Sequence, residues 1–130
     1  MSTTEGIICI VEDVKPIMKL LTTILEKHGF QTIGFSDGKT SIEWLQKNTP
    51  LAVVLDILLP DINGTEILSI IRQQPIGNTI PIIAVTGFAQ ASDRDKYLEM
   101  GFDSYIAKPI NTSTFPDEIR SVIEAKKGRN

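Results

Sequence analysis

Four short stretches of this 130-residue chain place acidic, hydroxyl and amine side chains at the ends of apolar runs. The stretches are "IICIVED", "AVVLD", "IIAVT" and "SYIAKP", and the side chains in question are Glu12 and Asp13, Asp56, Thr86, and Lys108. Parallel strands of one sheet end at a common edge, so these groups would meet there if each run is a strand. Three carboxylates, a hydroxyl and an amine could together bind a metal ion and a phosphoryl group.

The three carboxylates predict a divalent cation. Clustered carboxylates repel one another, and a cation offsets that repulsion. All of these ligands are oxygen atoms; the single histidine, His28, lies in another segment, and the single cysteine, Cys9, is interpreted as a core residue of its apolar run. Mg²⁺ is the natural occupant, with Mn²⁺ as an alternative, because it prefers oxygen ligands and keeps positions open for phosphate oxygens.

Lys108 and Thr86 would face the metal from the other side, where they could take the remaining oxygens of a phosphoryl group. In that geometry Asp56 can act as a nucleophile and form an acyl phosphate. Each residue also has a simpler interpretation when it is taken alone. Asp13 or Thr86 could cap a helix, and Lys108 before Pro109 could be a surface charge. The occurrence of all these groups at one edge favours the phosphoryl site.

Alternating strands and helices must position these groups. Continuous apolar runs at Ile7–Val11, 51–55 and 82–85 predict strands that are covered on both faces. Two runs of mixed polarity, Gln31–Phe35 and Ser104–Ala107, predict edge strands. Five such βα units with right-handed crossovers favour an α/β fold, a doubly wound five-stranded parallel sheet in the order 2-1-3-4-5.

The segments between the strands have helical periodicity. Apolar residues at the helical spacing from Ile17 to Leu25 predict the first helix, with Gly29 at its C-terminal cap. Further helices are predicted over 39–48, over 64–73 and from about 92 to Gly101, and a last helix is marked by apolar residues at 115, 119, 122 and 123. The helix from about 92 begins at "SDRD", which resembles a capping box.

Composition indicates one ordinary globular domain. A net charge of −3 gives no electrostatic reason to expect nucleic-acid or anionic-membrane binding. The start "MSTTEG" has no signal-peptide character, and no apolar stretch approaches the roughly 20 residues that span a bilayer. We therefore expect a cytoplasmic protein with a single domain over residues 1–130, whose core runs from 7 to 125.

The chain resembles the receiver domains of response regulators, the family of the chemotaxis protein CheY with its flavodoxin-like (βα)5 fold. The resemblance covers residues 7 to about 125 and rests on "VED", "LDILLPDING", "AVTGF" and "SYIAKPI" in this order. "TGFAQASD" followed by "GFDSYIAKPI" is most similar to the DivK-like single-domain receivers. The resemblance implies a two-component signalling protein, a phosphoacceptor rather than an enzyme.

The resemblance implies a role for each matching residue. Asp56 would accept a phosphoryl group from a phosphohistidine of a sensor histidine kinase or phosphotransfer protein, and its site would also support autodephosphorylation. Asp13 and Asp56 would bind Mg²⁺ directly, Glu12 through water, and Leu58 through its backbone carbonyl.

The same resemblance implies a conformational switch. Lys108 would pair with a phosphoryl oxygen, directed by a cis bond to Pro109. Thr86 would move to hydrogen-bond the phosphoryl group, and Tyr105 would rotate inward behind it. The phosphoryl charge of about −1.5 to −2 would bias this two-state element. The face of the fourth helix, fifth strand and fifth helix would then control a downstream effector protein or fused output domain, and it is also a candidate homodimer interface.

Four residues depart from the pattern of the family. Glu12 is longer than the more common aspartate and would shift the metal slightly. Leu58 and Phe88 are apolar and would flank the path of a hydrolytic water, which predicts slower loss of phosphate than polar groups would give. Asn63 replaces a frequent aspartate and concerns the loop alone.

Three alternatives use a similar fold or a similar site. An FMN carrier needs a hydroxyl- or glycine-rich loop after the first strand, where "EDVKP" carries two negative charges. A dehalogenase-type phosphatase needs a second aspartate two residues after the nucleophile, where Leu58 stands. A receiver-like scaffold that binds partners without phosphorylation stays open. So do the identities of the kinase and the effector, and the choice between a stand-alone protein and a part of a larger regulator.

Overall fold

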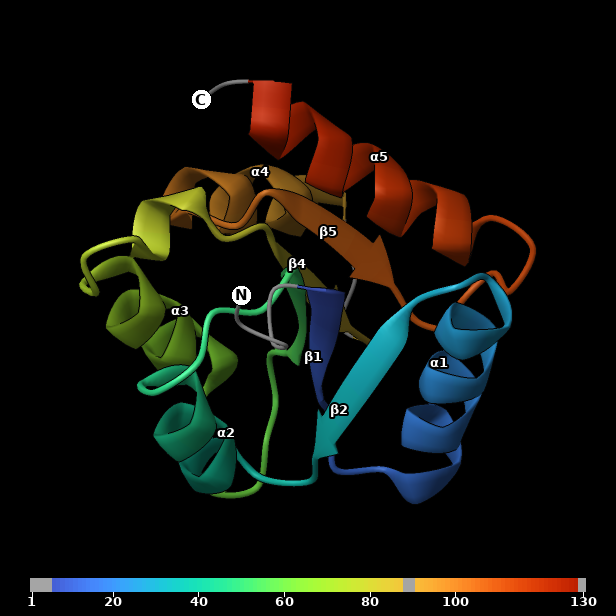
Figure 1. Ribbon diagram of the computed structural model, residues 1–130, viewed down its shortest axis with the longest axis horizontal. Helices are drawn as coiled ribbons and strands as arrows, with labels where there is room; N and C mark the ends of the chain where they lie inside the picture. The colour runs from blue at the N-terminus through green and yellow to red at the C-terminus, as the bar shows by residue number, and fades with distance from the viewer. Residues whose placement is uncertain (1–5, 88–90, 129–130) are drawn as a thin grey trace.

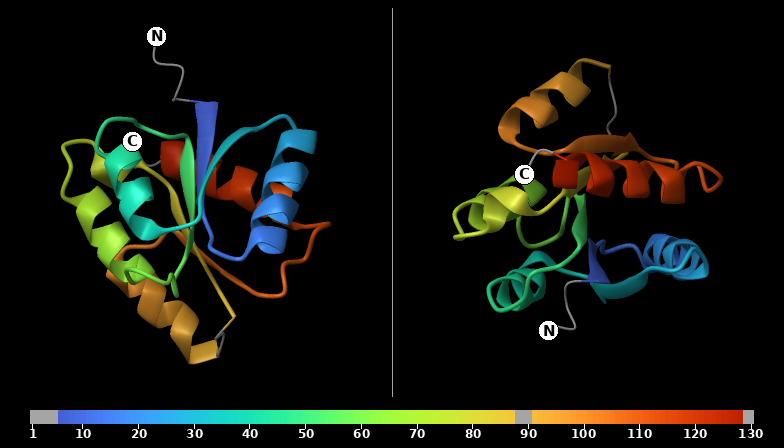
Figure 2. Two further views of the ribbon diagram at one scale, coloured as in Figure 1. Left: turned by 90° about the horizontal axis from the view of Figure 1, so that it is seen from below. Right: turned by 45° about the horizontal axis from the view of Figure 1, so that its top comes forward.

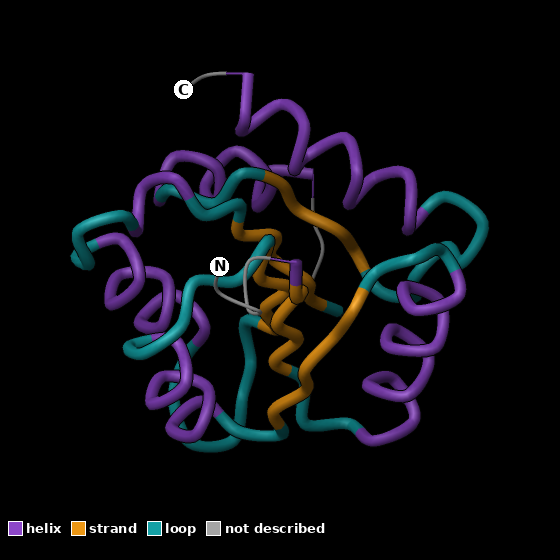
Figure 3. Tube along the Cα trace, in the orientation of Figure 1, coloured by secondary structure: helices purple, strands orange, loops and turns teal. Residues whose placement is uncertain are grey.

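A computed structural model of the chain describes residues 6–87 and 91–128. Five parallel strands form one sheet in the order β2-β1-β3-β4-β5, which confirms the predicted topology. The strands are β1 (Ile7–Val11), β2 (Gln31–Phe35), β3 (Ala52–Asp56), β4 (Ile82–Thr86) and β5 (Ser104–Ala107). The sheet passes through the middle of the molecule, with helices on both sides (Figures 1 and 3).

The helices are α1 (Lys15–Lys27), α2 (Gly38–Leu45), α3 (Gly64–Arg72), α4 (Ala91–Met100) and α5 (Phe115–Gly128), with a short 3₁₀ helix, η2 (Gly77–Thr79), before β4. Helices α1 and α5 cover one face of the sheet, and α2, α3 and α4 cover the other (Figures 1 and 2). No helix in the described part of the chain is long and apolar enough to cross a membrane.

Each face of the sheet has its own hydrophobic core. On the α1 and α5 side, Leu21, Leu25 and Phe115 pack against the sheet and are at most 1% exposed. On the other side, Cys9 lies fully buried among the side chains under α2 and α3. Burial raises the pKa of the Cys9 thiol, so this group stays protonated and unreactive, as its interpretation as a core residue requires.

Helix α1 ends as predicted, whereas α2 is shorter than predicted. Gly29 has a φ of +93°, the left-handed conformation that ends α1. Helix α2 ends at Leu45, three residues before its predicted end. There the Asn48 side chain donates a hydrogen bond of 2.9 Å to the carbonyl oxygen of Trp44, and Pro50 follows closely. The Asn48 side chain thus takes the place of the backbone N–H that would bond to the Trp44 carbonyl if the helix continued for another turn.

The last two helices also differ slightly from their predicted limits. Helix α4 begins at Ala91, one residue early, and ends just before Gly101, whose φ of +121° suits a glycine. The side chain of Ser92 lies outside the described part of the structure, so the capping box stays a prediction. Helix α5 continues to Gly128, beyond the core limit expected at residue 125.

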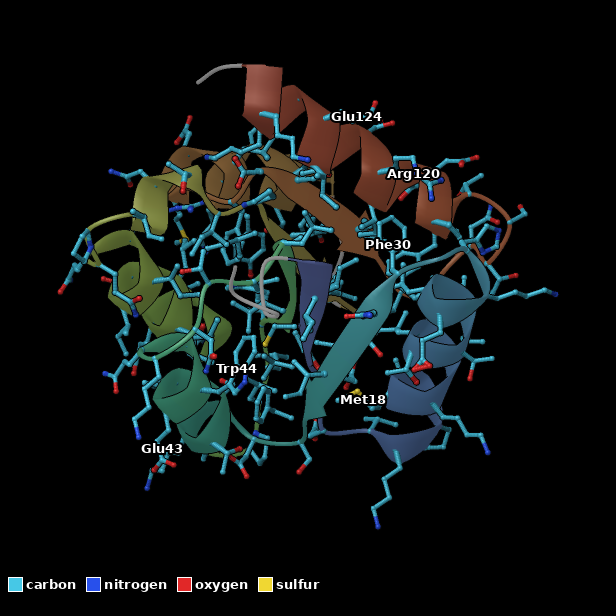
Figure 4. All side chains as sticks on the ribbon, in the orientation of Figure 1. Met18, Phe30, Glu43, Trp44, Arg120 and Glu124 are labelled. Carbon is cyan, nitrogen blue, oxygen red and sulfur yellow. The ribbon has the colours of Figure 1, made fainter. Side chains whose placement is uncertain are left out.

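Aromatic contacts attach helices to the open β2 edge of the sheet. The ring of Trp44 on α2 lies 5.9 Å from the ring of Phe35 at the end of β2. On the opposite face, the Arg120 guanidinium of α5 lies 4.9 Å from the centre of the Phe30 ring (Figure 4). Arg120 Nη2 also donates to the His28 carbonyl oxygen at 3.2 Å. The β2 edge is therefore fastened to a helix on each face.

Candidate functional site

The carboxyl ends of the central strands bring three polar side chains together inside the protein. Glu12 directly follows β1, Asp56 ends β3 and Thr86 ends β4. These three residues are 2%, 5% and 2% exposed, respectively. Because Val11 is paired with Leu55 in the sheet, the next residues of the two strands, Glu12 and Asp56, are also neighbours. Buried carboxylates at this position require partners.

Lys108 supplies the positive partner. Thr86 is paired with Ala107, so Lys108 leaves β5 at the same edge of the sheet. The Lys108 Nζ atom lies 2.7 Å from Glu12 Oε1 and 3.3 Å from Asp56 Oδ2. The peptide bond between Lys108 and Pro109 is cis. The ammonium group thus lies between two buried carboxylates and is closer to that of Glu12.

The charge of Lys108 is stabilised by these neighbours. Burial alone would lower the pKa of the Lys108 ammonium, but the carboxylates of Glu12 and Asp56 outweigh burial and raise the pKa above its ordinary value. Lys108 is therefore a cation throughout the physiological pH range.

Backbone N–H groups orient the remaining oxygens of the two buried carboxylates. The N–H of Val14 donates to Glu12 Oε2, and the N–H of Leu58 donates to Asp56 Oδ1, both at 3.1 Å. Such charge-assisted hydrogen bonds fix a carboxylate in one orientation. The alternative that Asp13 caps the first helix is wrong, because the N-cap of α1 is Val14 and no side chain caps it.

The acidic cluster fits a divalent cation. Glu12, Asp13 and Asp56 each offer a carboxylate oxygen, and these three oxygens lie within 4.8 Å of one another. The ligands are hard, anionic oxygen atoms, which suit Mg²⁺ or Mn²⁺ better than zinc. Lys108 offsets only one of the three negative charges, so a cation would relieve the remaining repulsion.

The loop after β3 forms one wall of the site. Leu58, whose N–H bonds to Asp56 Oδ1, is 50% exposed. Asn63 caps α3 by accepting a hydrogen bond of 2.9 Å from the N–H of Thr65, so its role is in the loop, as expected. Phe88, the second apolar residue expected beside the site, lies outside the described residues.

Asp61 in the same loop has a role that the sequence analysis missed. Its Oδ1 accepts a hydrogen bond of 2.8 Å from the N–H of Gly38, and its Oδ2 accepts one of 3.0 Å from the N–H of Lys39. The loop beside the site is thereby tied to the first turn of α2. The bonds from Gly38 and Lys39 lower the pKa of Asp61 below its ordinary value.

The lowered pKa of Asp61 predicts a pH dependence of stability on the acid side. The ionised carboxylate stabilises the folded state above the ordinary aspartate pKa of about 3.9, and this stabilisation is lost as the pH falls through the lower folded-state pKa. Asp61→Asn should therefore reduce the loss of stability between about pH 5 and pH 3. Urea unfolding at several pH values measures this slope. A slope equal to that of the wild type would contradict the prediction.

Tyr105 of β5 already lies inside the protein. It is 9% exposed, and its ring stacks on Tyr97 of α4 with the centroids 5.6 Å apart and the planes at 14°. Burial raises the pKa of the Tyr105 hydroxyl. The inward rotation of Tyr105 that is expected on phosphorylation is a change from an exposed to a buried orientation of the ring. This structure contains the buried orientation.

Fold and site together define a doubly wound α/β protein with an acidic cluster and a buried lysine at the carboxyl ends of its strands. The response regulator receiver domain family matches residues 8–120 of the chain. The chain therefore belongs to the response regulator receiver domain family of two-component signalling.

Relatives and solved structures agree with this assignment. The polar-differentiation response regulator DivK of Brucella anthropi is 32% identical over 116 residues, which are 89% of this chain and 94% of that protein. A CheY-like receiver domain from Methanospirillum hungatei has a TM-score of 0.84 at 26% identity and covers 96% of this chain and 98% of its own. The receiver domain of a Pseudomonas aeruginosa sensor histidine kinase, with magnesium in its active-site cleft, has a TM-score of 0.83 at 27% identity, with 92% and 98% covered.

Proposed function

We propose that the chain accepts a phosphoryl group on Asp56 and transmits the change through its α4–β5–α5 face. The donor would be a phosphohistidine of a sensor histidine kinase or of a phosphotransfer protein. The observation that supports this role is the buried Asp56 carboxylate, which lies 3.3 Å from Lys108 Nζ in a cluster of three carboxylates. Membership of the receiver family supports the same role.

The residues of the site would act as follows. An oxygen of Asp56 attacks the phosphorus while the bond from phosphorus to the imidazole nitrogen breaks, and the imidazole keeps the bonding pair and takes up a proton. Leu58 N–H and Lys108 Nζ, which already contact Asp56, orient the carboxylate, and Lys108 then pairs with a phosphoryl oxygen.

A bound Mg²⁺ would neutralise negative charge on the transferred group. Glu12, Asp13 and Asp56 would hold it, together with the backbone carbonyl of Leu58. The magnesium ion in the Pseudomonas receiver domain supports this choice of metal. The exposed Leu58 side chain offers no hydrogen bond to an attacking water, which supports slow autodephosphorylation.

The output surface of the proposed switch contains a groove. Its volume is about 940 Å³, and its lining comes from α4, β5, α5 and the loop before α5, including Arg94, Tyr105, Asn111 and Val122. Thr86 at the end of β4 and Tyr105 of β5, which lines the groove, would connect the groove to the site. A downstream effector protein, a fused output domain or a second copy of the chain would bind there.

Intact-mass measurement tests the proposed function. Acetyl phosphate and Mg²⁺ should add one phosphoryl group to the wild type, and none to Asp56→Asn or to the wild type with EDTA. Asp61→Asn, on the same loop, is the matched control and should keep the gain. If the wild type gains no mass from acetyl phosphate or from a phosphorylated histidine kinase, the proposed function is wrong.

Lys108 is expected to compete with the metal for Glu12. The substitution Lys108→Met removes the ammonium group that lies 2.7 Å from Glu12 Oε1. Mg²⁺ should then bind about 3- to 10-fold more tightly, because a competing charge has been removed from a partly screened site. Titration calorimetry measures this change. The gain should shrink in a Glu12→Gln background, since the contact is absent there. Equal gains in the two backgrounds would show that Lys108 opposes the metal through Asp56 instead.

A further inference from the structure

Helix α4 has little apolar surface with which to hold its place. Five of its ten residues are charged: Asp93, Arg94, Asp95, Lys96 and Glu99. Of its described side chains, those of Tyr97 and Leu98 are the half-buried apolar ones. The helix lies at the β5 end of the sheet, away from α1 and α2 (Figure 2). The few apolar contacts of α4 therefore matter more than those of an ordinary amphipathic helix.

Tyr97 makes two specific aromatic contacts. Its ring stacks on that of Tyr105, with the centroids 5.6 Å apart and the planes at 14°. The same ring meets Phe102 edge-on, with the centroids 5.9 Å apart and the planes at 87°. These are the two arrangements that aromatic pairs favour. Phe102 is only 3% exposed, so Tyr97 connects the Tyr105 ring to a fixed part of the core.

The hydroxyl group of Tyr105 makes the buried position of the ring energetically less favourable. Its oxygen is buried and has no hydrogen-bond partner among the described residues. A buried hydroxyl without a partner is unfavourable, because water would bond it in an outward orientation. Packing of the ring must therefore outweigh this loss, and the stacked Tyr97 ring covers one face of it.

We propose that Tyr97 is a positioning residue that holds Tyr105 inward when Asp56 carries no phosphoryl group. The orientation of Tyr105 then depends on a stacking contact within the α4–β5 unit as well as on the phosphorylation site. Tyr105 lines the groove between α4, β5 and α5, so Tyr97 determines the shape of that groove in the unmodified protein. The consequence for signalling rests on the proposed function, whereas the position of the ring does not.

The chain has only two tyrosines, which makes the inference directly testable. In Tyr97→Phe or Tyr97→Leu, Tyr105 is the single tyrosine, so 3-fluorotyrosine labelling gives one ¹⁹F environment and nitration by tetranitromethane modifies one site. Tyr97→Phe keeps the stacked ring and should keep Tyr105 protected. In Tyr97→Leu, nitration should be about 10-fold faster, and the ¹⁹F resonance should move toward that of exposed fluorotyrosine. Equal nitration rates and equal chemical shifts in the two variants would overturn the inference.

A second variant separates the Tyr97 ring from the general attachment of α4. Tyr97→Phe/Leu98→Ala loosens the same helix but keeps the stacked ring, and Tyr105 is again the single tyrosine. Its nitration rate should remain near that of Tyr97→Phe. A rate as high as that of Tyr97→Leu would show that any loosening of α4 exposes Tyr105, and the specific role of Tyr97 would be wrong. Circular dichroism identifies a variant that has lost its fold.

Phosphorylation of the same samples distinguishes failure of the inference from failure of the proposed function. After acetyl phosphate and Mg²⁺, the ¹⁹F resonance of Tyr97→Phe should move little, because the ring is already inside. The resonance of Tyr97→Leu should move toward the buried position. A large inward shift in Tyr97→Phe would overturn the inference. Absence of a phosphoryl group on Asp56 would overturn the proposed function and leave the comparison of unmodified variants intact.

Discussion

Asp103→Ala is expected to lower the free energy of unfolding by about 3 kcal/mol and the melting temperature by about 10 °C. Asp103 Oδ2 accepts hydrogen bonds from the N–H of Ile82 at 2.8 Å and from Arg72 Nη2 at 2.9 Å. Its Oδ1 accepts one from Lys126 Nζ at 2.9 Å. The Asp103 side chain is 8% exposed, so its removal leaves two nearly buried cations and a backbone N–H without their shared partner.

The damage would extend beyond Asp103 because Arg72 holds several segments at once. Arg72 Nη1 donates to the carbonyl oxygens of Gly77 and Ile80 at 2.6 and 2.7 Å, and Nη2 donates to that of Gly101 at 2.9 Å. The cluster thus joins the end of α3, the turn before β4, the turn after α4, and α5 through Lys126. Asp103 orients the guanidinium that makes these bonds.

Urea unfolding of the wild type, Asp103→Ala and a surface control measures the effect. The control is Asp117→Ala, because Asp117 is 84% exposed and its ion-pair distance to Arg120 is 3.8 Å. It should cost less than about 1 kcal/mol. If Asp103→Ala costs no more than this control, the cluster does not contribute to stability. Asp103 directly precedes β5 and so lies at the amino ends of the strands, whereas the phosphorylation site lies at their carboxyl ends. Phosphorylation of the folded variant should therefore match the wild type.

The order of the elements could be predicted because each strand and helix has a local signal. The run at Ile7–Val11 is uniformly apolar, since β1 has helices on both of its faces, whereas Gln31–Phe35 is mixed because β2 is an edge strand. The end of α2 was predicted wrongly. Its end depends on the Asn48 side chain bonding to the Trp44 carbonyl, which competes with one more helical turn and leaves the apolar pattern unchanged.

The residues at the edge of the sheet could also be predicted, because strand ends are visible in the sequence. Their distances could not. Lys108 lies closer to Glu12 than to Asp56, and this depends on the register of β5 and on the length of the glutamate side chain. The partners of Asp61 and Asp103 lie more than 20 residues away along the chain, in elements that meet only after folding. Neither residue belongs to a local sequence pattern that predicts such a contact.

Gly64→Ala is expected to lower the free energy of unfolding by about 2 kcal/mol and to slow phosphorylation of Asp56 about 10-fold. A Cβ atom at Gly64 would lie 2.6 Å from the carbonyl oxygen of Asp56 and 2.9 Å from the Cα of Ile57. Both are backbone atoms, so no side chain can move away to make room. The Gly64 N–H also donates to the Ile57 carbonyl oxygen at 2.7 Å, which holds the first turn of α3 against β3.

The slower phosphorylation would follow from the same contact. To relieve the overlap, either α3 moves outward or the backbone of Asp56 moves, and the second change displaces its carboxylate from Lys108 and from the N–H of Leu58. Alanine favours a helix over glycine by about 1 kcal/mol, so a net loss of stability would isolate the steric term. Gly6→Ala is the matched control, because no atom of the described residues beyond its chain neighbours lies within 4 Å of a Cβ built there, and it should change both quantities little. Urea unfolding and the rate of mass gain with acetyl phosphate measure the two effects. A Gly64→Ala protein that is less stable but is phosphorylated at the wild-type rate would show that α3 moves while Asp56 stays in place.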